Sequence, residues 1–164
     1  MIPSATPLHP DLRDRLLSIR IFLATALVAL LAAGFAAAVF AHAPTRPLMW
    51  MVAYLVLVGG VAQAVLGIGQ ALLPPDPPSR RWCLLEWSLF NAGNLGVIAG
   101  TLAERTALVT LGTLLFVASL GTFLAGVRGQ RAGWLLTLFR GVLVLVLLGA
   151  GTGLALTLSG IVRR

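Results

Sequence analysis

The chain has 164 residues, of which 59% are hydrophobic and only 10% are charged, and its mean hydropathy is +0.97. Because about a quarter of the residues of a soluble domain are charged, this composition excludes an ordinary soluble domain and predicts an integral membrane protein. The formal charge of +7 does not indicate nucleic-acid binding, since the basic residues stand singly or in pairs between apolar runs and form no basic stripe with interleaved aromatic residues. The predicted surroundings are a lipid bilayer.

Cysteine and histidine are scarce in the chain, which contains one thiol, Cys83, and two imidazoles, His9 and His42. A single thiol excludes an intramolecular disulfide and a metal site built from several thiolates of one chain. The two histidines lie in the N-terminal segment and at the edge of the first apolar run, where they cannot ligate a haem in the centre of the membrane. We predict no metal site and no resident cofactor, and we keep a bound lipid or quinone as an alternative.

Residues 1–17 form a polar N-terminal tail that begins MIPSATPLHPDLRDR. This tail is typical of a short surface segment or an interfacial helix. Asp11 is suited to cap a helical turn that runs into the first apolar stretch. We expect residues 18–164 to form a single transmembrane domain.

Five apolar stretches follow the tail, and each is near or above the roughly 20 residues that cross the hydrocarbon core of a bilayer. The predicted fold is an all-α bundle of five transmembrane helices at 18–41, 48–73, 82–103, 106–127 and 134–161. The connecting pieces are short, so consecutive helices are expected to be antiparallel neighbours. A cleaved signal peptide ending near Ala41-His42-Ala43 would leave four helices, but the apolar run before it exceeds the roughly 7–15 residues of a secretory signal.

The arginines indicate which side of the membrane each connection faces. With the N-terminus in the cytoplasm, seven arginines lie inside and four outside, in agreement with the positive-inside rule: Arg13, Arg15, Arg20, Arg80, Arg81, Arg128 and Arg131 against Arg46, Arg105, Arg163 and Arg164. The last two arginines oppose the rule, so a C-terminus on the inner side is the alternative. The runs GGVAQAVLGIGQALLPP and EWSLFNAGNLGVIAG are typical of small bacterial multi-pass proteins, so we expect the bacterial cytoplasmic membrane.

Polar residues interrupt the second and third apolar stretches at Gln63, Gln70, Glu86, Asn91 and Asn94. A bare carboxylate at the centre of a membrane helix costs about 2.5–3.5 kcal/mol on insertion scales, so Glu86 is expected to face a partner. At 1.5 Å per residue, Gln70 and Glu86 lie about 6 Å from the inner ends of their spans, and Gln63 and Asn94 about 16–18 Å. The spacing predicts two polar layers along a seam between the second and third spans.

Small residues share helix faces with these polar groups. At 100° per residue, one face of the second span combines two glycines with the two glutamines, Gly59, Gln63, Gly67 and Gln70. The third span has a similar face, made of Glu86, Gly93 and Gly100 with Asn94 to one side. We expect these two faces to meet, because small residues let helix backbones approach closely in a membrane.

Two GxxxG pairs add to the small residues, Gly96 with Gly100 and Gly149 with Gly153. Such pairs favour close helix contacts. In a chain with 18 glycines this spacing also arises by chance, so we expect the pairs to pack within the chain and do not infer an oligomer from them.

Arginine is the candidate counter-charge for the buried carboxylate. Arg140 lies about 9 Å into the fifth span on the inner side, level with Glu86, so an ion pair between the third and fifth spans is geometrically allowed. Arg20, at the start of the first span, is the alternative partner. Arg140 could instead extend its side chain to the inner headgroups.

Catalytic signatures are missing from the sequence, which contains no HExxH, no GxSxG, no Walker loop and no paired carboxylates. We therefore do not expect an enzyme. The first functional hypothesis is a small subunit or assembly factor of a larger membrane complex, with a protein partner or a second copy of the chain.

Two other functions remain as alternatives. One is a small solute or ion translocator in which Glu86 changes protonation beside Gln63, Gln70, Asn91 and Asn94. The other is a lipid-, quinone- or cofactor-binding protein that holds a head group in the inner polar layer.

Overall fold

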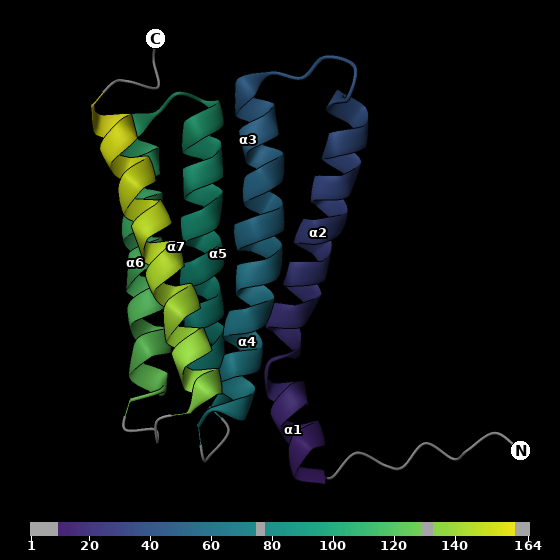
Figure 1. Cartoon of the computed structure of the whole chain (residues 1–164), viewed down its shortest axis with the longest axis vertical. Helices are drawn as coiled ribbons and strands as arrows, with labels where there is room; N and C mark the ends of the chain where they lie inside the picture. Colours follow the sequence, from purple (N-terminus) through teal and green to yellow (C-terminus); the bar gives the residue numbers. More distant parts are fainter. Residues whose placement is uncertain (1–9, 75–77, 129–132, 160–164) are drawn as a thin grey trace, which may run out of the picture.

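The computed structural model describes residues 10–74, 78–128 and 133–159, in which all regular elements are helices (Figure 1). In chain order they are α1 (Pro10–Ser18), α2 (Arg20–Phe40), α3 (Arg46–Tyr54), the π-helix η1 (Leu55–Ala62), α4 (Gln63–Leu72), α5 (Arg80–Leu102), α6 (Thr106–Gly126) and α7 (Trp134–Leu158). α3, η1 and α4 form one continuous rod. The long helices lie side by side, with α2 on one flank, α6 and α7 on the other, and the rod and α5 between them (Figure 1).

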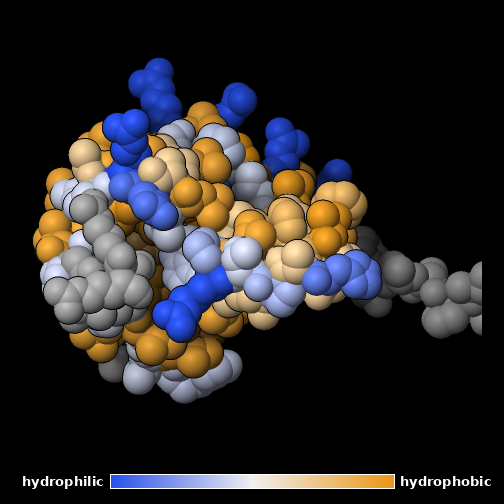
Figure 2. Space-filling model, turned by 90° about the horizontal axis from the view of Figure 1, so that it is seen from above, coloured by the Kyte–Doolittle hydropathy of each residue, from blue (hydrophilic) through white to orange (hydrophobic). Residues whose placement is uncertain are grey.

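Four helices of the described chain are long and apolar enough to cross a membrane: Arg20–Phe40, Arg46–Leu72, Thr106–Gly126 and Trp134–Ala155. Most of their exposed large hydrophobic side chains are leucine and valine. Seen from one end, hydrophobic residues lie around the bundle and hydrophilic ones project from that end (Figure 2). A soluble monomer rarely exposes so continuous an apolar surface. The structure therefore indicates an all-α integral membrane protein. α5 is equally long but falls outside these four, because it carries the carboxylate, both asparagines and several small residues.

The N-terminal helix α1 is separated from α2 by Ile19, which is fully buried. Asp11 does not precede this helix as a cap, because the helix already begins at Pro10. The Arg15 guanidinium donates to the carbonyl of Ala71 over 3.1 Å and to that of Pro74 over 2.8 Å. These carbonyls end α4, where a cation is favoured by the helix dipole. α1 is thus fastened to the end of the second span.

The hydrophobic core lies in the half of the bundle nearest α1 and the start of α7. It draws on five helices and is rich in phenylalanine: Ile19, Phe22, Leu66, Ala71, Cys83, Phe90, Phe116, Leu120, Phe123, Val127, Leu136, Phe139 and Leu143. Phe123 is central, with its ring centroid 5.6 Å from that of Phe22 and 6.2 Å from that of Phe90. The aromatic rings therefore join α2, α5 and α6.

Glycines bring α5 and α6 into backbone contact. A Cβ atom added at Gly93 would lie 2.6 Å from the backbone nitrogen of Phe116, and one added at Gly96 would lie 2.8 Å from Gly112 Cα. At Gly100 the nearest atom would be the backbone nitrogen of Val109, at 2.6 Å. The small face of the third span thus packs on the fourth span.

The glycines of the second span pack on the first span. Cβ atoms added at Gly59 and Gly67 would lie 3.1 Å from Ala29 Cβ and 2.7 Å from Phe22 Cβ. The expectation that the two small faces meet is therefore wrong for their glycines, which are filled by α2 and α6. It holds for the polar residues at the inner ends of the two faces, Gln70 and Glu86, which contact each other.

The second GxxxG pair behaves differently from the first. No atom of the described chain lies within 4 Å of a Cβ added at Gly149 or Gly153. From Leu147 onward, the described residues of α7 are exposed or half-buried. The expectation that this pair packs within the chain is not met among the described residues, because α7 contacts the core through other side chains, Leu136, Phe139 and Leu143 with the half-buried Val146 and Ala150.

Candidate functional site

The inner polar layer is a contact between Gln70 of α4 and Glu86 of α5. Gln70 Nε2 donates to Glu86 Oε1 over 2.8 Å, as their equal depth suggested. The two side chains are 1% and 0% exposed. Gln70 Oε1 and Glu86 Oε2 have no hydrogen-bond partner within the described ranges. The structure therefore brings these two predicted residues together and leaves one oxygen of each unpaired.

The surroundings of this pair are apolar and closely packed. A Cβ added at Gly126 of α6 would lie 2.9 Å from Gln70 Nε2, so the amide rests on the glycine. A Cβ added at Gly69 would lie 2.2 Å from the ring of Phe139 of α7. Phe90 follows Glu86 by one helical turn on the same buried face of α5. The pair is thus covered by α6 at Gly126, with α7 packed beside it at Gly69, and both side chains are screened from water.

A threonine joins three helices at the next level. Gln63 Nε2 of α4 and Trp87 Nε1 of α5 both donate to Thr25 Oγ1 of α2, the latter over 3.2 Å. Thr25 Oγ1 in turn donates to the carbonyl of Ile21 over 2.7 Å. Thr25 was not predicted as part of the site, although its hydroxyl group in the first span could have indicated a hydrogen-bond partner for the polar residues of the other spans. Gln63 consequently faces α2 and makes no hydrogen bond to Asn94 in the structure.

Asn94 pairs instead with a tyrosine at the end of α3. Tyr54 Oη donates to Asn94 Oδ1 over 2.7 Å, and the Tyr54 ring lies 5.0 Å from that of Trp50. Asn94 Nδ2 is buried and has no hydrogen-bond partner within the described ranges. Tyr54, the single tyrosine of the chain, was not predicted either, because only amide and carboxylate side chains were placed by their depth in the membrane.

Asn91 does not join the contacts between helices. Its Nδ2 donates to the carbonyl of Trp87 over 2.8 Å, within α5, and its side chain is half-buried. A bond of this kind satisfies the amide locally and ties no second helix. The structure therefore separates Asn91 from the other predicted residues.

The predicted ion pair is not formed among the described residues. Arg20 and Arg140 are both exposed on the bundle surface, and Glu86 Oε1 is bonded to Gln70 while Oε2 has no partner. The expected pairing fails because a long arginine side chain near a helix end reaches the lipid headgroups at a lower free-energy cost than it enters an aromatic core.

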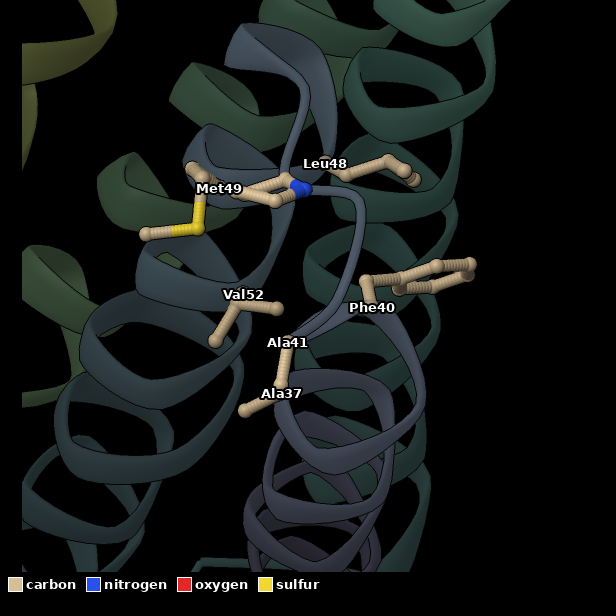
Figure 3. Close-up of a pocket in the computed structure, with 7 residues that line it drawn as sticks. Ala37, Phe40, Ala41, Leu48, Met49 and Val52 are labelled. Carbon is tan, nitrogen blue, oxygen red and sulfur yellow. The ribbon is translucent and has the colours of Figure 1, made fainter.

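Two of the hollows on the bundle surface lie away from the polar layers. One, of about 270 Å³, lies between the end of α2 and the start of α3, where Ala37, Ala41 and Val52 stand between the helices (Figure 3). The other is a shallow surface along one face of α7 from Trp134 to Leu145. Both linings are mainly apolar, as expected for surfaces that face lipid chains. No cluster of three metal-ligating side chains occurs among the described residues.

The fold and these contacts define a class, an integral membrane helix bundle whose interior polar side chains connect neighbouring helices. No family model matches the sequence, and no curated protein or solved structure matches it.

Proposed function

We propose that the protein is a non-catalytic, multi-pass subunit or assembly factor of a larger membrane complex. The observation that carries this proposal is the contrast between the two GxxxG pairs. Gly96 and Gly100 are filled by the backbone of α6, whereas Gly149 and Gly153 have no neighbour in the described chain. The same spacing that supports close helix contact inside the bundle is thus presented outward on α7. We propose that a transmembrane helix of a partner protein fills it.

The interior polar groups support a structural role. Gln70 with Glu86, Tyr54 with Asn94, and Thr25 with its two donors each link different helices. These side chains are largely occupied by one another in a closely packed interior. Interhelical bonds of this kind average about 0.6 kcal/mol in membrane proteins, so together they help to fix which helices are neighbours.

The proposal includes the topology of the chain in the membrane. We propose that α5 crosses as a fifth span, because it lies inside the bundle and turns Glu86 and Asn94 inward, where they are 0% and 6% exposed. The proposed orientation places the N-terminus in the cytoplasm of a bacterial cell. It is supported by the clustering of α1, the start of α5 and the end of α6 at one end of the bundle (Figure 1), since these segments carry most of the inner-side arginines.

Co-purification from native membranes tests the partner. The tagged wild-type chain in mild detergent is expected to elute with a larger protein, and the double variant Gly149→Leu/Gly153→Leu is expected to lose it. Gly34→Leu and Gly121→Leu are matched controls, because a Cβ added at either position also meets no described atom within 4 Å. Loss of the partner in the controls as well, or a wild-type chain that elutes alone, would contradict the proposal.

A second candidate function, proton-coupled translocation, is favoured by one observation, the unpartnered Glu86 Oε2 in the interior. Ionisable groups inside membrane bundles commonly serve proton or ion pathways. Proteoliposomes containing the chain would then show a proton flux that Glu86→Gln abolishes. Equal fluxes in the variant and the wild type would reject this candidate.

A further inference from the structure

The contact between Gln70 and Glu86 poses a hydrogen-bonding problem. With Gln70 Nε2 donating to Glu86 Oε1, the remaining oxygen of each side chain is a buried acceptor without a donor. An ionised carboxylate only accepts hydrogen bonds, and an amide oxygen does likewise. Leaving a buried polar atom unsatisfied costs about 1–3 kcal/mol. A hydrogen carried by one of these oxygens would satisfy both at once.

We propose that Glu86 and Gln70 form a proton-binding site, in which Glu86 is a neutral carboxylic acid whose Oε2–H donates to Gln70 Oε1. The acid and the amide then share two hydrogen bonds that run in opposite directions and close a ring. The bound species is one proton, taken from water and attached to Oε2, and no other bond changes. The site goes beyond the proposed subunit role and does not depend on it.

The charged groups on the elements around the pair provide no counter-charge for an ionised Glu86. Four arginines on these elements are exposed, Arg20 of α2, Arg80 and Arg81 of α5, and Arg140 of α7. α4 and α6 contain no charged residue. Arg15 of α1 is directed to the carbonyls that end α4. Cys83, also titratable, is buried one turn before Glu86 on α5. An ionised carboxylate with no cation beside it is costly in a membrane interior, and the neutral acid avoids this cost.

Two other ways to satisfy the oxygens fit the structure less well. No donor of α5 satisfies the carboxyl group, since Glu86 Oε2 has no hydrogen-bond partner among the described residues. A metal ion would need more oxygen ligands than these two side-chain atoms supply, and no cluster of three metal-ligating side chains occurs among the described residues. A proton needs only the two oxygens.

Isotope-edited infrared spectroscopy provides a direct test, because the chain contains only two glutamates, Glu86 and Glu104. Glu104 lies exposed in the turn between α5 and α6, so its carboxyl group is the solvated reference for the buried one. With ¹³C at the side-chain carboxyl of glutamate, half of the labelled groups in the folded wild-type protein in lipid vesicles are expected to show the protonated-acid band at pH 7. The other half should show the carboxylate band.

Three variants assign the band. Glu86→Gln, which keeps the size of the side chain and a neutral pair, should abolish the acid band, whereas Glu104→Gln should leave it as the whole labelled signal. Gln70→Leu should shift the band toward that of an acid without a hydrogen-bond acceptor. A wild-type spectrum containing only carboxylate would overturn the proposal. So would an acid band that survives Glu86→Gln or is unchanged by Gln70→Leu.

Discussion

The backbone contact between α5 and α6 predicts a large effect from a single added methyl group. In Gly112→Ala, the new Cβ would lie 2.5 Å from the backbone nitrogen of Val97 and 2.7 Å from the carbonyl carbon of Gly96. Ordinary van der Waals contact for a Cβ begins near 3.4 Å, so the two helices must separate by about 0.9 Å at this point. Because the obstructing atoms are backbone, no side-chain rotation relieves the clash.

The magnitude follows from the required separation. Inserting a methyl group into a well-packed interior typically costs about 1–3 kcal/mol, and a gap of about 0.5–1 Å forfeits a quarter to a half of the dispersion attraction of the atoms that line it. Gly121→Ala on the same helix is the matched control, because its Cβ meets no described atom within 4 Å. Both variants gain the same helix propensity of about 0.5–1 kcal/mol, so their difference isolates the contact.

The assay is unfolding in mixtures of a mild detergent and sodium dodecyl sulfate, followed by circular dichroism. Gly112→Ala is expected to be less stable than Gly121→Ala by about 1–3 kcal/mol. Equal stabilities of the two variants would refute the close approach of α5 and α6, and with it the assignment of the small face of α5 to α6.

Three further predictions use the same assay or a related one. Thr25→Val removes the shared acceptor of two interior N–H groups and is expected to cost about 1–2 kcal/mol, whereas Thr137→Val at an exposed position of α7 should change the stability little; equal effects would contradict the threonine junction. Tyr54→Phe should lower the stability by about 0.6 kcal/mol, the average for a hydrogen bond between membrane helices, and no further loss should follow when Asn94→Leu is added to it. Cys83, 2% exposed, should react with a maleimide far more slowly in the folded protein than after unfolding in dodecyl sulfate, and similar rates would show that the inner core is open.

Sequence reasoning located the helices well because apolar length is a strong signal in a membrane protein. The predicted first and third spans, 18–41 and 82–103, lie within two residues of α2 and α5 at each end. The depth argument was also sufficient to place Gln70 beside Glu86, since helix rise is constant and the connection between α4 and α5 is short.

The helix that covers each small or polar face could not be predicted from the sequence. Helical angles correctly grouped Gly59, Gln63 and Gly67 on one face, but angles do not state which helix covers a face, and α2 covers this one. The partners Thr25 and Tyr54 were not predicted, because burying a hydroxyl group in a membrane costs much less free energy than burying a charge and gives no comparable signal in the sequence. Arginine was assigned to Glu86 on the assumption that a carboxylate must be charged, whereas the structure gives it an amide.

The π-helix η1 sets how the two ends of the second span are turned relative to each other. Its i to i+5 hydrogen bonds enclose one residue more than those of an α-helix, and it lies between Tyr54 and Gln63, which bond to α5 and α2 respectively. Deleting one residue within 55–62 would remove the residue that the wider turns accommodate, so the segment could become α-helical with Tyr54 and Gln63 still on nearly their present faces. The same deletion in α3 or α4 would turn the residues beyond it by about 100° and would separate one of the two side chains from its partner helix. The segment is therefore the part of this span that can lose a single residue while both contacts are kept.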